Sequence, residues 1–225
     1  MISAVTAYVP LPGHPRNEET YRELGRQLMD TEIPLILMEG QLEQCWMHQY
    51  LQHRNKRYTH SVADNPRKNS ISYLIVQAQK SEWLVAAAEH RPDVEVFVWI
   101  DFGIFSVPGV NGHIIQEFLL RAMHEQAIAI PGCWDKNYQY DDSQPCWRFC
   151  GGVMVVPRQY VMQFDYAMKR EYVRWLEQTN NLSWEVNTLA RVEKLDPELP
   201  LWWFKADHDA TMFTSYQPAD RTVMH

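Results

Sequence analysis

The feature that most constrains the fold is an alternation of short apolar runs with longer segments of helical periodicity. The run 94–100, VEVFVWI, is apolar at nearly every position, as expected for a parallel strand covered on both faces. The segment 158–179 instead repeats apolar residues every three or four positions, which is typical of a helix lying on a sheet. This alternation predicts an α/β fold with a mostly parallel sheet flanked by helices. The apolar runs are 2–11, 33–39, 94–100, 127–132, 150–157 and 199–209, and the helical segments are 17–30, 70–90, 112–125, 158–179 and 184–198.

Length and charge narrow the class of protein further. A chain of 225 residues predicts a single domain spanning 1–225. The formal net charge of −7 disfavours binding to nucleic acid or to an anionic membrane, since both need a basic surface. The N-terminal segment lacks a basic start followed by an apolar core, and no run reaches the roughly 20 apolar residues that cross a bilayer. We therefore expect a soluble, cytoplasmic protein.

Asp101 directly follows the apolar run 94–100, and Gly103 comes two residues later. In a mostly parallel sheet, ligands bind beyond the carboxyl ends of the strands, so this carboxylate stands where a ligand site forms. A carboxylate there can hold Mg²⁺ or Mn²⁺ shared with substrate phosphates, and a glycine lets the backbone approach a phosphate or sugar. The plainer alternative is a side chain that caps the next turn. Asp-Phe-Gly also matches the magnesium motif of protein kinases, but their glycine-rich and His-Arg-Asp motifs are missing from this sequence.

The sequence around Asp101 resembles the HtrL/YibB family, a group of bacterial proteins classed with the GT-A glycosyltransferases. The resemblance rests on VFVWIDFGIF (96–105) and continues in the same order through FCGGVMVVP (149–157) and FKADHD (204–209). It implies a GT-A-like, Rossmann-like fold. It also implies transfer of a sugar from a nucleoside-diphosphate sugar to an acceptor hydroxyl, with Mn²⁺ or Mg²⁺. GT-A enzymes carry Asp-x-Asp at this point, whereas Gly103 stands here in place of the second aspartate and removes one expected metal ligand.

The same resemblance assigns roles to further residues. Asp101 would bind the metal, and Glu185 would take the proton of the acceptor hydroxyl as general base. His208, or a flanking Asp207 or Asp209, would complete the metal site. The residues expected to contact the base, diphosphate or sugar of the donor are Thr6, Tyr8, Lys80, Gly103, Gly151, Gly152 and Trp184.

Several of these residues also have an ordinary structural interpretation, and both interpretations stay open. Glu185 opens a helical segment, where the helix dipole favours a carboxylate. Lys80 lies within a helical segment, where a lysine usually faces solvent. Gly151 and Gly152 can mark a bulge or tight packing, and Trp184 can simply fill the core.

The function also keeps alternatives. The same aspartate and metal would serve a metal-dependent phosphohydrolase or nucleotidyltransferase, and the missing second aspartate is compatible with a non-catalytic nucleotide-sugar binder. Cys133, Cys146 and Cys150 lie close together in the sequence, as in some zinc sites. No Cys-x-x-Cys or His-x-x-x-His pair accompanies them, so reduced, buried thiols are the favoured interpretation.

Overall fold

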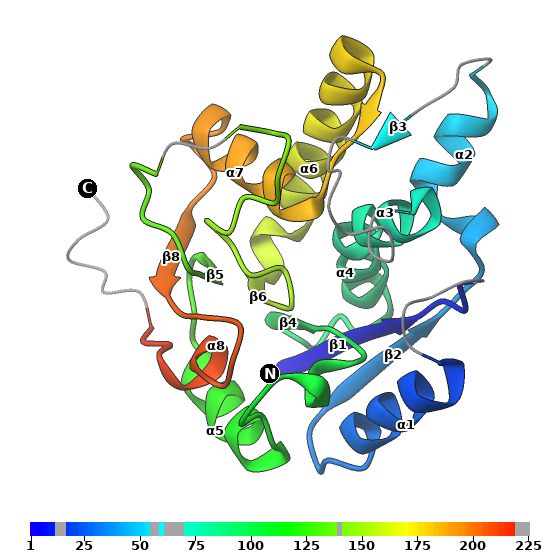
Figure 1. Cartoon of the computed structure of the whole chain (residues 1–225). Helices are drawn as coiled ribbons and strands as arrows, with labels where there is room; N and C mark the ends of the chain where they lie inside the picture. Colours follow the sequence, from blue (N-terminus) through cyan, green and yellow to red (C-terminus); the bar gives the residue numbers. More distant parts are fainter. Residues whose placement is uncertain (12–16, 55–58, 61–69, 139–140, 219–225) are drawn as a thin grey trace.

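A six-stranded sheet lies between two layers of helices in the computed structural model, which describes residues 1–11, 17–54, 59–60, 70–138 and 141–218 (Figure 1). The strand order is β2-β1-β4-β6-β5-β8, and β3 pairs with β7 in a separate, parallel two-stranded sheet. The strands are β1 (Ile2–Tyr8), β2 (Leu35–Glu39), β3 (Thr59–His60), β4 (Val96–Ile100), β5 (Ile128–Gly132), β6 (Val153–Pro157), β7 (Asn181–Leu182) and β8 (Leu201–Lys205).

Five of the six strands run in one direction, and β6 runs against them. β1 pairs in parallel with β2 and β4, and β5 pairs in parallel with β8. β6 is antiparallel to both of its neighbours, β4 and β5. The mostly parallel α/β fold predicted from the sequence is thus confirmed. Because β6 is reversed, it begins at the edge where the other strands end, and there the Asp101 N–H donates to the Gly152 carbonyl over 2.9 Å.

Alternate side chains of β4 serve two apolar cores, one on each face of the sheet. Val98 and Ile100 pack on one face, and Phe97 and Trp99 pack on the other. All four are almost completely buried, and burial of each such side chain contributes about 1.5–3 kcal/mol. The first face is covered by α1 (Glu18–Met29), α5 (Gly112–Ala122) and α8 (Thr211–Thr214), and the second by α2 (Trp46–Gln52), α3 (Ile71–Ala78), α4 (Lys80–His90), α6 (Arg158–Thr179) and α7 (Glu185–Leu195).

Two elements differ from the sequence-based expectation. The apolar run 33–39 predicts a strand buried on both faces, but β2 is an outer strand of the sheet and its side chains are only partly buried. The segment 70–90 predicts one helix, whereas the structure divides it at Gln79 into α3 and α4. The Gln79 Oε1 accepts a hydrogen bond from the Trp46 N–H over 2.8 Å, which holds this residue between the helices. Lys80 is therefore the first residue of α4.

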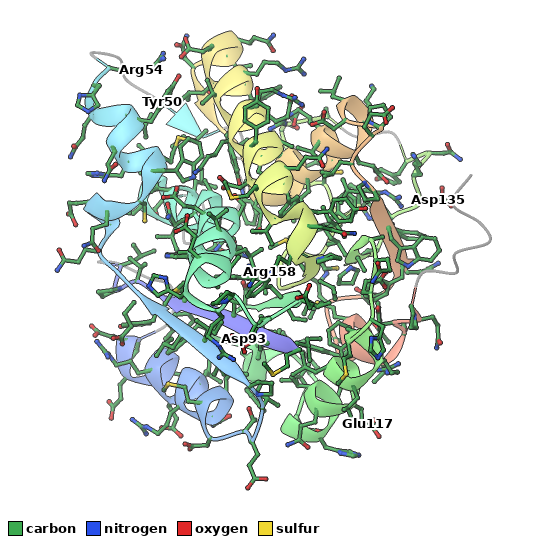
Figure 2. The ribbon with its side chains drawn as sticks, turned by 180° about the vertical axis from the view of Figure 1, so that it is seen from behind. Tyr50, Arg54, Asp93, Glu117, Asp135 and Arg158 are labelled. Atoms are coloured by element: carbon green, nitrogen blue, oxygen red, sulfur yellow. The ribbon has the colours of Figure 1, made fainter. Side chains whose placement is uncertain are left out.

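Arg158 fastens the amino-terminal edge of the central strands, opposite Asp101. It follows β6 directly, and its guanidinium donates to the carbonyls of Val94 over 2.5 Å and Ala88 over 3.0 Å. Asp93, which precedes β4, belongs to the same edge (Figure 2). These contacts join the end of α4 to the beginning of β4, at the edge of the sheet that lies opposite Asp101.

The helix α6 has 22 residues and packs one side against the sheet, with charged residues along the other. Near its end, Glu177 accepts a hydrogen bond from Tyr50 over 2.9 Å and pairs with Arg54, which attaches α2 (Figure 2). Within the described ranges, no helix has both the length and the apolarity to cross a bilayer.

Candidate active site

Asp101 stands at the carboxyl end of β4, as predicted. Its main-chain carbonyl accepts the Ile104 N–H over 2.9 Å and begins the 3₁₀ turn η2 (Ile104–Ser106). Its side chain does not cap this turn. The Oδ1 atom accepts a hydrogen bond from Trp99 Nε1 over 2.8 Å and lies 2.8 Å from Lys80 Nζ, while the side chain is 38% exposed. The Asp101 carboxylate is therefore partly exposed to solvent, and its Oδ1 atom is held by Trp99 and Lys80.

Lys80 is buried beneath this carboxylate, with its side chain only 3% exposed. Its ammonium lies 2.8 Å from Asp101 Oδ1, 2.8 Å from Glu185 Oε2 and 2.8 Å from the Gly151 carbonyl oxygen. Burial lowers the pKa of Lys80, but the charges of Asp101 and Glu185 outweigh it and raise the pKa above its ordinary value. An ammonium has three N–H donors, so these three partners use all of them. We call Lys80, Asp101 and Glu185 the lysine trio.

Glu185 is the first residue of α7 and has a side chain only 4% exposed. Its Oε2 accepts from Lys80, and its buried Oε1 has no hydrogen-bond partner in the structure. Burial raises the pKa of this carboxyl to about 7, with Lys80 lowering it and the charge of Asp101 raising it further. A carboxyl with such a pKa exchanges a proton near neutral pH, which is the property of a general acid or base.

Gly151 is required by the close approach of Glu185. A Cβ atom at Gly151 would lie 2.5 Å from Glu185 Oε2, well inside van der Waals contact. A Cβ atom at Gly152 would meet nothing closer than Asp101 Oδ2 at 3.7 Å. The two neighbouring glycines thus differ: the first makes room for a side chain of the lysine trio, and the second leaves ordinary contact distances.

The lysine trio borders a cavity of about 280 Å³ at the carboxyl edge of the sheet. This volume is close to the lower end of the roughly 300–1,000 Å³ usual for small-molecule sites. The ammonium of Lys80 also lies 5.5 Å from the centre of the Trp99 ring, so an aromatic face supports the charged group. The aromatic residues that line the cavity are Tyr21, Tyr73, Trp83, Trp99, Phe102, Trp147 and Trp184.

Most of the predicted site residues meet at this cavity. The residues that line it are Lys80, Asp101, Gly103, Gly151, Gly152, Trp184, Glu185 and His208. Lys80 does not lie on a solvent-facing helix surface, the position that its ordinary structural interpretation predicts. It is buried, and its N–H groups are committed to the two carboxylates and Gly151, so its geometry suits a residue that positions them.

Thr6 and Tyr8, expected near the base of the donor, do not line the cavity. Thr6 is completely buried within β1. Tyr8 is 5% exposed, its hydroxyl donates to Glu18, and its ring lies 5.0 Å from that of Phe102. Tyr8 thus packs behind Phe102, which lines the cavity. Because Tyr8 is 5% exposed, its ring has little surface on which a base could stack.

The expected partners of Asp101 in a metal site are engaged elsewhere. Asp209 accepts from the N–H and hydroxyl of Thr211 at the beginning of α8 and does not line the cavity. His208 lines the cavity, but its Nδ1 lies 3.5 Å from Cys133 Sγ and 3.7 Å from Asp207 Oδ1. Among the described residues, Asp101 belongs to no group of three or more side chains spaced for one ion. A Mn²⁺ or Mg²⁺ ion here would need ligands from a substrate.

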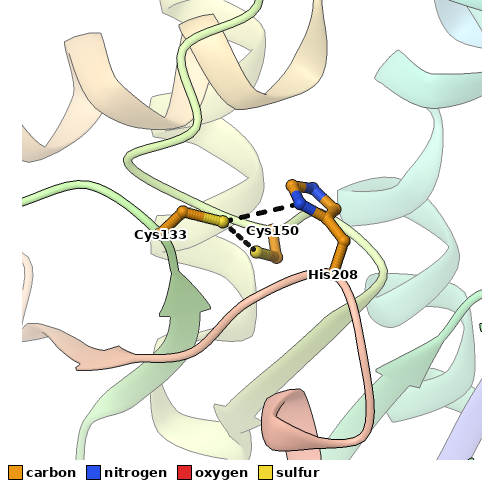
Figure 3. Close-up of side chains that lie close together, drawn as sticks. All are labelled: Cys133, Cys150 and His208. Carbon is orange, nitrogen blue, oxygen red and sulfur yellow. Dashed lines mark hydrogen bonds between the residues drawn. The ribbon is translucent and has the colours of Figure 1, made fainter. Parts of the chain in front are cut away.

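Cys133, Cys150 and His208 form a second group, which we call the thiol cluster. Its three ligand atoms all lie within 4.8 Å of one another (Figure 3). The hydrogen bond with Cys150, offset in part by burial, and the contact with His208 lower the pKa of the Cys133 thiol below its ordinary value. Cys146 is buried elsewhere, with its N–H bound to the side chain of Asn187. Of the three cysteines that are close in sequence, two therefore meet, and the third ligand is a histidine.

Sequence reasoning missed most of the aromatic wall. Tyr21 comes from α1, Tyr73 from α3, and Trp147 from the segment before β6. In the sequence, each of these residues has the pattern of an ordinary apolar position within its own segment. The one signal that could have found them is the high aromatic content, 12% of the chain, but content does not say which rings share a surface.

No protein-family model and no curated protein matches this sequence. The fold resembles the crystal structure of a glycosyltransferase involved in the glycosylation of the major capsid of PBCV-1. That structure aligns with a TM-score of 0.51 and 13% identity over 92% of this chain and 81% of the other. A 4-diphosphocytidyl-2C-methyl-D-erythritol synthase from Anaerococcus prevotii aligns over 98% of this chain and 91% of its own, at 11% identity and a TM-score of 0.41.

The first of these comparisons bears on the fold alone, because 13% identity is too low to transfer a function or a residue role. It extends over most of both chains. The chain therefore has an α/β fold that resembles the fold of this glycosyltransferase.

Proposed function

We propose that this protein is a glycosyltransferase that moves a sugar from a nucleoside-diphosphate sugar to an acceptor hydroxyl. The observation that carries the proposal is the lysine trio, a buried ammonium between two carboxylates, at the floor of an aromatic cavity. In sheets of this kind, ligands bind beyond the carboxyl ends of the strands, where this cavity lies. The resemblance of the fold to that of a glycosyltransferase supports the same class of reaction.

The cavity has the surfaces that a sugar donor needs. Aromatic rings such as Trp147 and Trp184 offer apolar faces to the C–H side of a sugar ring. Gly103 and Gly152 line the cavity without side chains, so their backbone is open to close approach. A volume of about 280 Å³ suits a sugar with its adjoining phosphate better than a whole nucleotide sugar. We therefore place the transferred sugar, and not the base, against the lysine trio.

Glu185 is the proposed general base. The acceptor oxygen attacks the anomeric carbon and forms the new C–O bond, while the bond from that carbon to the diphosphate oxygen breaks. The nucleoside diphosphate leaves with the electron pair, and the acceptor proton passes to the Glu185 carboxylate. Glu185 lines the cavity, so its carboxylate is proposed to receive this proton. Lys80 acts as a positioning residue that holds both carboxylates.

A divalent ion remains part of the proposal. Asp101 Oδ2 has no partner among the described residues, and a carboxylate oxygen is a ligand that Mg²⁺ and Mn²⁺ accept. The ion would offset charge on the departing diphosphate, which would itself supply several ligands. The protein groups around Asp101 do not form a complete site, so binding of the ion is expected only together with the donor.

The test is release of nucleoside diphosphate from a panel of UDP-, GDP-, ADP- and dTDP-sugars, with and without Mn²⁺. Asp101→Asn should lower the turnover of whichever donor is used by about 100-fold or more, as for loss of a group that stabilises the transition state. Asp93→Asn is the matched control, because Asp93 pairs with Arg91 at the opposite edge of the sheet. It should keep wild-type turnover.

The products decide between this reaction and its alternatives. From a nucleotide sugar, a nucleotidyltransferase would transfer the nucleoside monophosphate and release a sugar phosphate. A phosphohydrolase would use water instead and release both the nucleoside monophosphate and the sugar phosphate. Neither would release a nucleoside diphosphate, and ³¹P NMR distinguishes these products. A non-catalytic binder would show heat on mixing in calorimetry and no product at all. Any of these three results, or equal loss of turnover in Asp93→Asn and Asp101→Asn, would overturn the proposal.

A further inference from the structure

The thiol cluster joins three separate segments at the carboxyl edge of the sheet. Cys133 directly follows β5, Cys150 stands three residues before β6, and His208 follows β8. Cys133 Sγ lies 3.6 Å from Cys150 Sγ and 3.5 Å from His208 Nδ1, and both contacts are drawn in Figure 3. Ligand atoms from positions so far apart in sequence are brought together by the fold itself, since the strands that carry them are neighbours.

These spacings agree with those of a tetrahedral metal site. Zinc binds sulfur at about 2.3 Å and nitrogen at about 2.0–2.1 Å, so tetrahedral angles separate two sulfur ligands by about 3.8 Å and a sulfur from a nitrogen by about 3.6 Å. The observed 3.6 Å and 3.5 Å lie close to both values. We propose that Cys133, Cys150 and His208 bind a Zn²⁺ ion.

Asp207 is the proposed fourth ligand. Its Oδ1 lies 3.7 Å from Cys133 Sγ and 3.7 Å from His208 Nδ1. Its side chain is 78% exposed, so it can turn toward an ion without disturbing the core. Two thiolates, one imidazole and one carboxylate make a donor set that zinc accepts, and the charge of the two thiolates favours zinc over Mg²⁺ or Mn²⁺.

The surroundings of the cluster already hold its ligands in place. The His208 ring packs edge-on against Trp147, with ring centres 4.4 Å apart. Cys150 is 1% exposed, and its N–H donates to the Pro131 carbonyl over 2.7 Å. The Cys133 N–H donates to the Trp147 carbonyl over 2.9 Å. These contacts set the positions of the ligands. The ion would link the segment after β5, the segment before β6 and the segment after β8.

The proposed ion would also shape the wall of the cavity. His208 and Trp147 both line it, so an ion held by His208 would fix this part of the wall. Binding replaces the protons of two thiols with the metal and releases them to solvent. It also uses His208 Nδ1, which is then no ligand for an ion at Asp101. The chief rival is a disulfide between Cys133 and Cys150, since their sulfur atoms are adjacent.

The experiment measures metal binding by the full chain, independently of any transfer reaction. Protein stripped with a chelator under reducing conditions is titrated with Zn²⁺ against a chromophoric competitor, and with Co²⁺ as a spectroscopic probe. We expect one ion per chain and a thiolate-to-cobalt charge-transfer band with the strong visible bands of tetrahedral Co²⁺. Cys133→Ser, Cys150→Ser and His208→Ala should each weaken zinc binding by more than about 100-fold, the upper range for loss of outer-shell partners alone.

Cys146→Ser is the matched control, because Cys146 is equally buried and lies outside the cluster. It should bind zinc as wild type does. His208→Ala tests the site even if a cysteine variant unfolds, since the His208 side chain is 45% exposed. Zinc binding unchanged in His208→Ala, or weakened as much in Cys146→Ser, would overturn the proposal. So would the absence of zinc binding by reduced wild type together with a Cys133–Cys150 disulfide in the oxidised protein.

Discussion

The lysine trio lines the cavity, the thiol cluster reaches it through His208, and the two groups are built in opposite ways. In the trio, a buried ammonium is balanced by two carboxylates and every N–H of Lys80 has a partner. In the thiol cluster, no fixed charge stands among Cys133, Cys150 and His208 to hold them, and two of the three are partly exposed. The first group is balanced by charges within the protein, and the second has ligand atoms spaced as the proposed zinc site requires.

The two groups differ in how their side chains are held in position before a ligand binds. Paired charges with excellent geometry fix a structure before any ligand arrives, and removal of one partner is strongly destabilising. The thiols and the imidazole are instead positioned by packing and backbone contacts, and a metal ion would add bonds between them. The floor of the cavity should therefore be rigid in the free protein, while the wall around His208 should tighten with metal.

The largest expected effect comes from breaking the lysine trio. Lys80→Met keeps the apolar stem but leaves Glu185 buried without its cation, which should destabilise the fold by about 3–5 kcal/mol. For a chain of this size, thermal denaturation should show a melting temperature lower by about 10 °C. Zinc binding should be unchanged. The double variant Lys80→Met/Glu185→Gln, which removes both charges, should recover part of the loss, and failure to recover any would contradict the charge argument.

Glu185→Gln tests whether the Glu185 carboxylate takes part in the transfer reaction. If Glu185 is the general base, its loss should lower transferase turnover by about 100-fold or more. Wild-type turnover should rise as the pH passes through about 7, the raised pKa of Glu185, and the variant should lose this rise. A pH profile that is identical in both proteins would assign the proton transfer to another group.

The same variant has a stability signature whose sign is fixed. Because burial raises the Glu185 pKa above its unfolded value of 4.5, the protonated form stabilises the fold most below that value. This contribution is lost as the pH rises toward about 7. Urea denaturation between these limits should show wild-type stability falling with pH more steeply than that of Glu185→Gln.

Zinc should stabilise the protein through the thiol cluster. At a free concentration 100 times the dissociation constant, an ion that binds only the folded state adds about 2.7 kcal/mol, or about 5–10 °C in melting temperature. Lys80→Met should show the same upward shift from its lower starting point. A zinc effect that disappears in Lys80→Met would mean that the two groups are one cooperative unit.

The smallest effect distinguishes two adjacent glycines. Gly151→Ala would place a Cβ atom 2.5 Å from Glu185 Oε2 and should destabilise the fold by about 1–2 kcal/mol through overpacking. Gly152→Ala meets only ordinary contacts, so urea denaturation should find it within about 0.5 kcal/mol of wild type. Equal values for both would show that the trio has more room than its geometry indicates.

The sequence predicts the parts of this protein that depend on local pattern. The apolar run 94–100 is long enough, and apolar enough on both faces, to identify a central strand and so to place Asp101 at its end. The helix 158–179 and the first turn of α7 with Glu185 follow from periodicity in the same way. A pattern of this kind covers one helix or strand, and it predicts where a residue lies within that helix or strand.

Contacts between distant segments were beyond such patterns. Lys80 has the surroundings of a solvent-facing lysine within its own helix, and only Asp101 and Glu185, which lies 105 residues away, make its burial possible. The grouping of Cys133 with Cys150 and His208, and not with Cys146, likewise depends on which strands become neighbours. In each case the deciding partner is contributed by the fold and is not visible in the local sequence.

The reversed direction of β6 has a consequence for how this protein can diverge. Since β5 and β6 run in opposite directions, the chain leaves the sheet after Gly132 and rejoins it at Val153 on the same edge. The connection between them therefore begins and ends at the same edge of the sheet. Its two ends are joined where the N–H groups of Cys133 and Trp134 donate to the Trp147 carbonyl. A change in its length alters no strand order and no crossover. The part of the cavity wall that carries Trp147 can therefore change in length while the sheet keeps its arrangement.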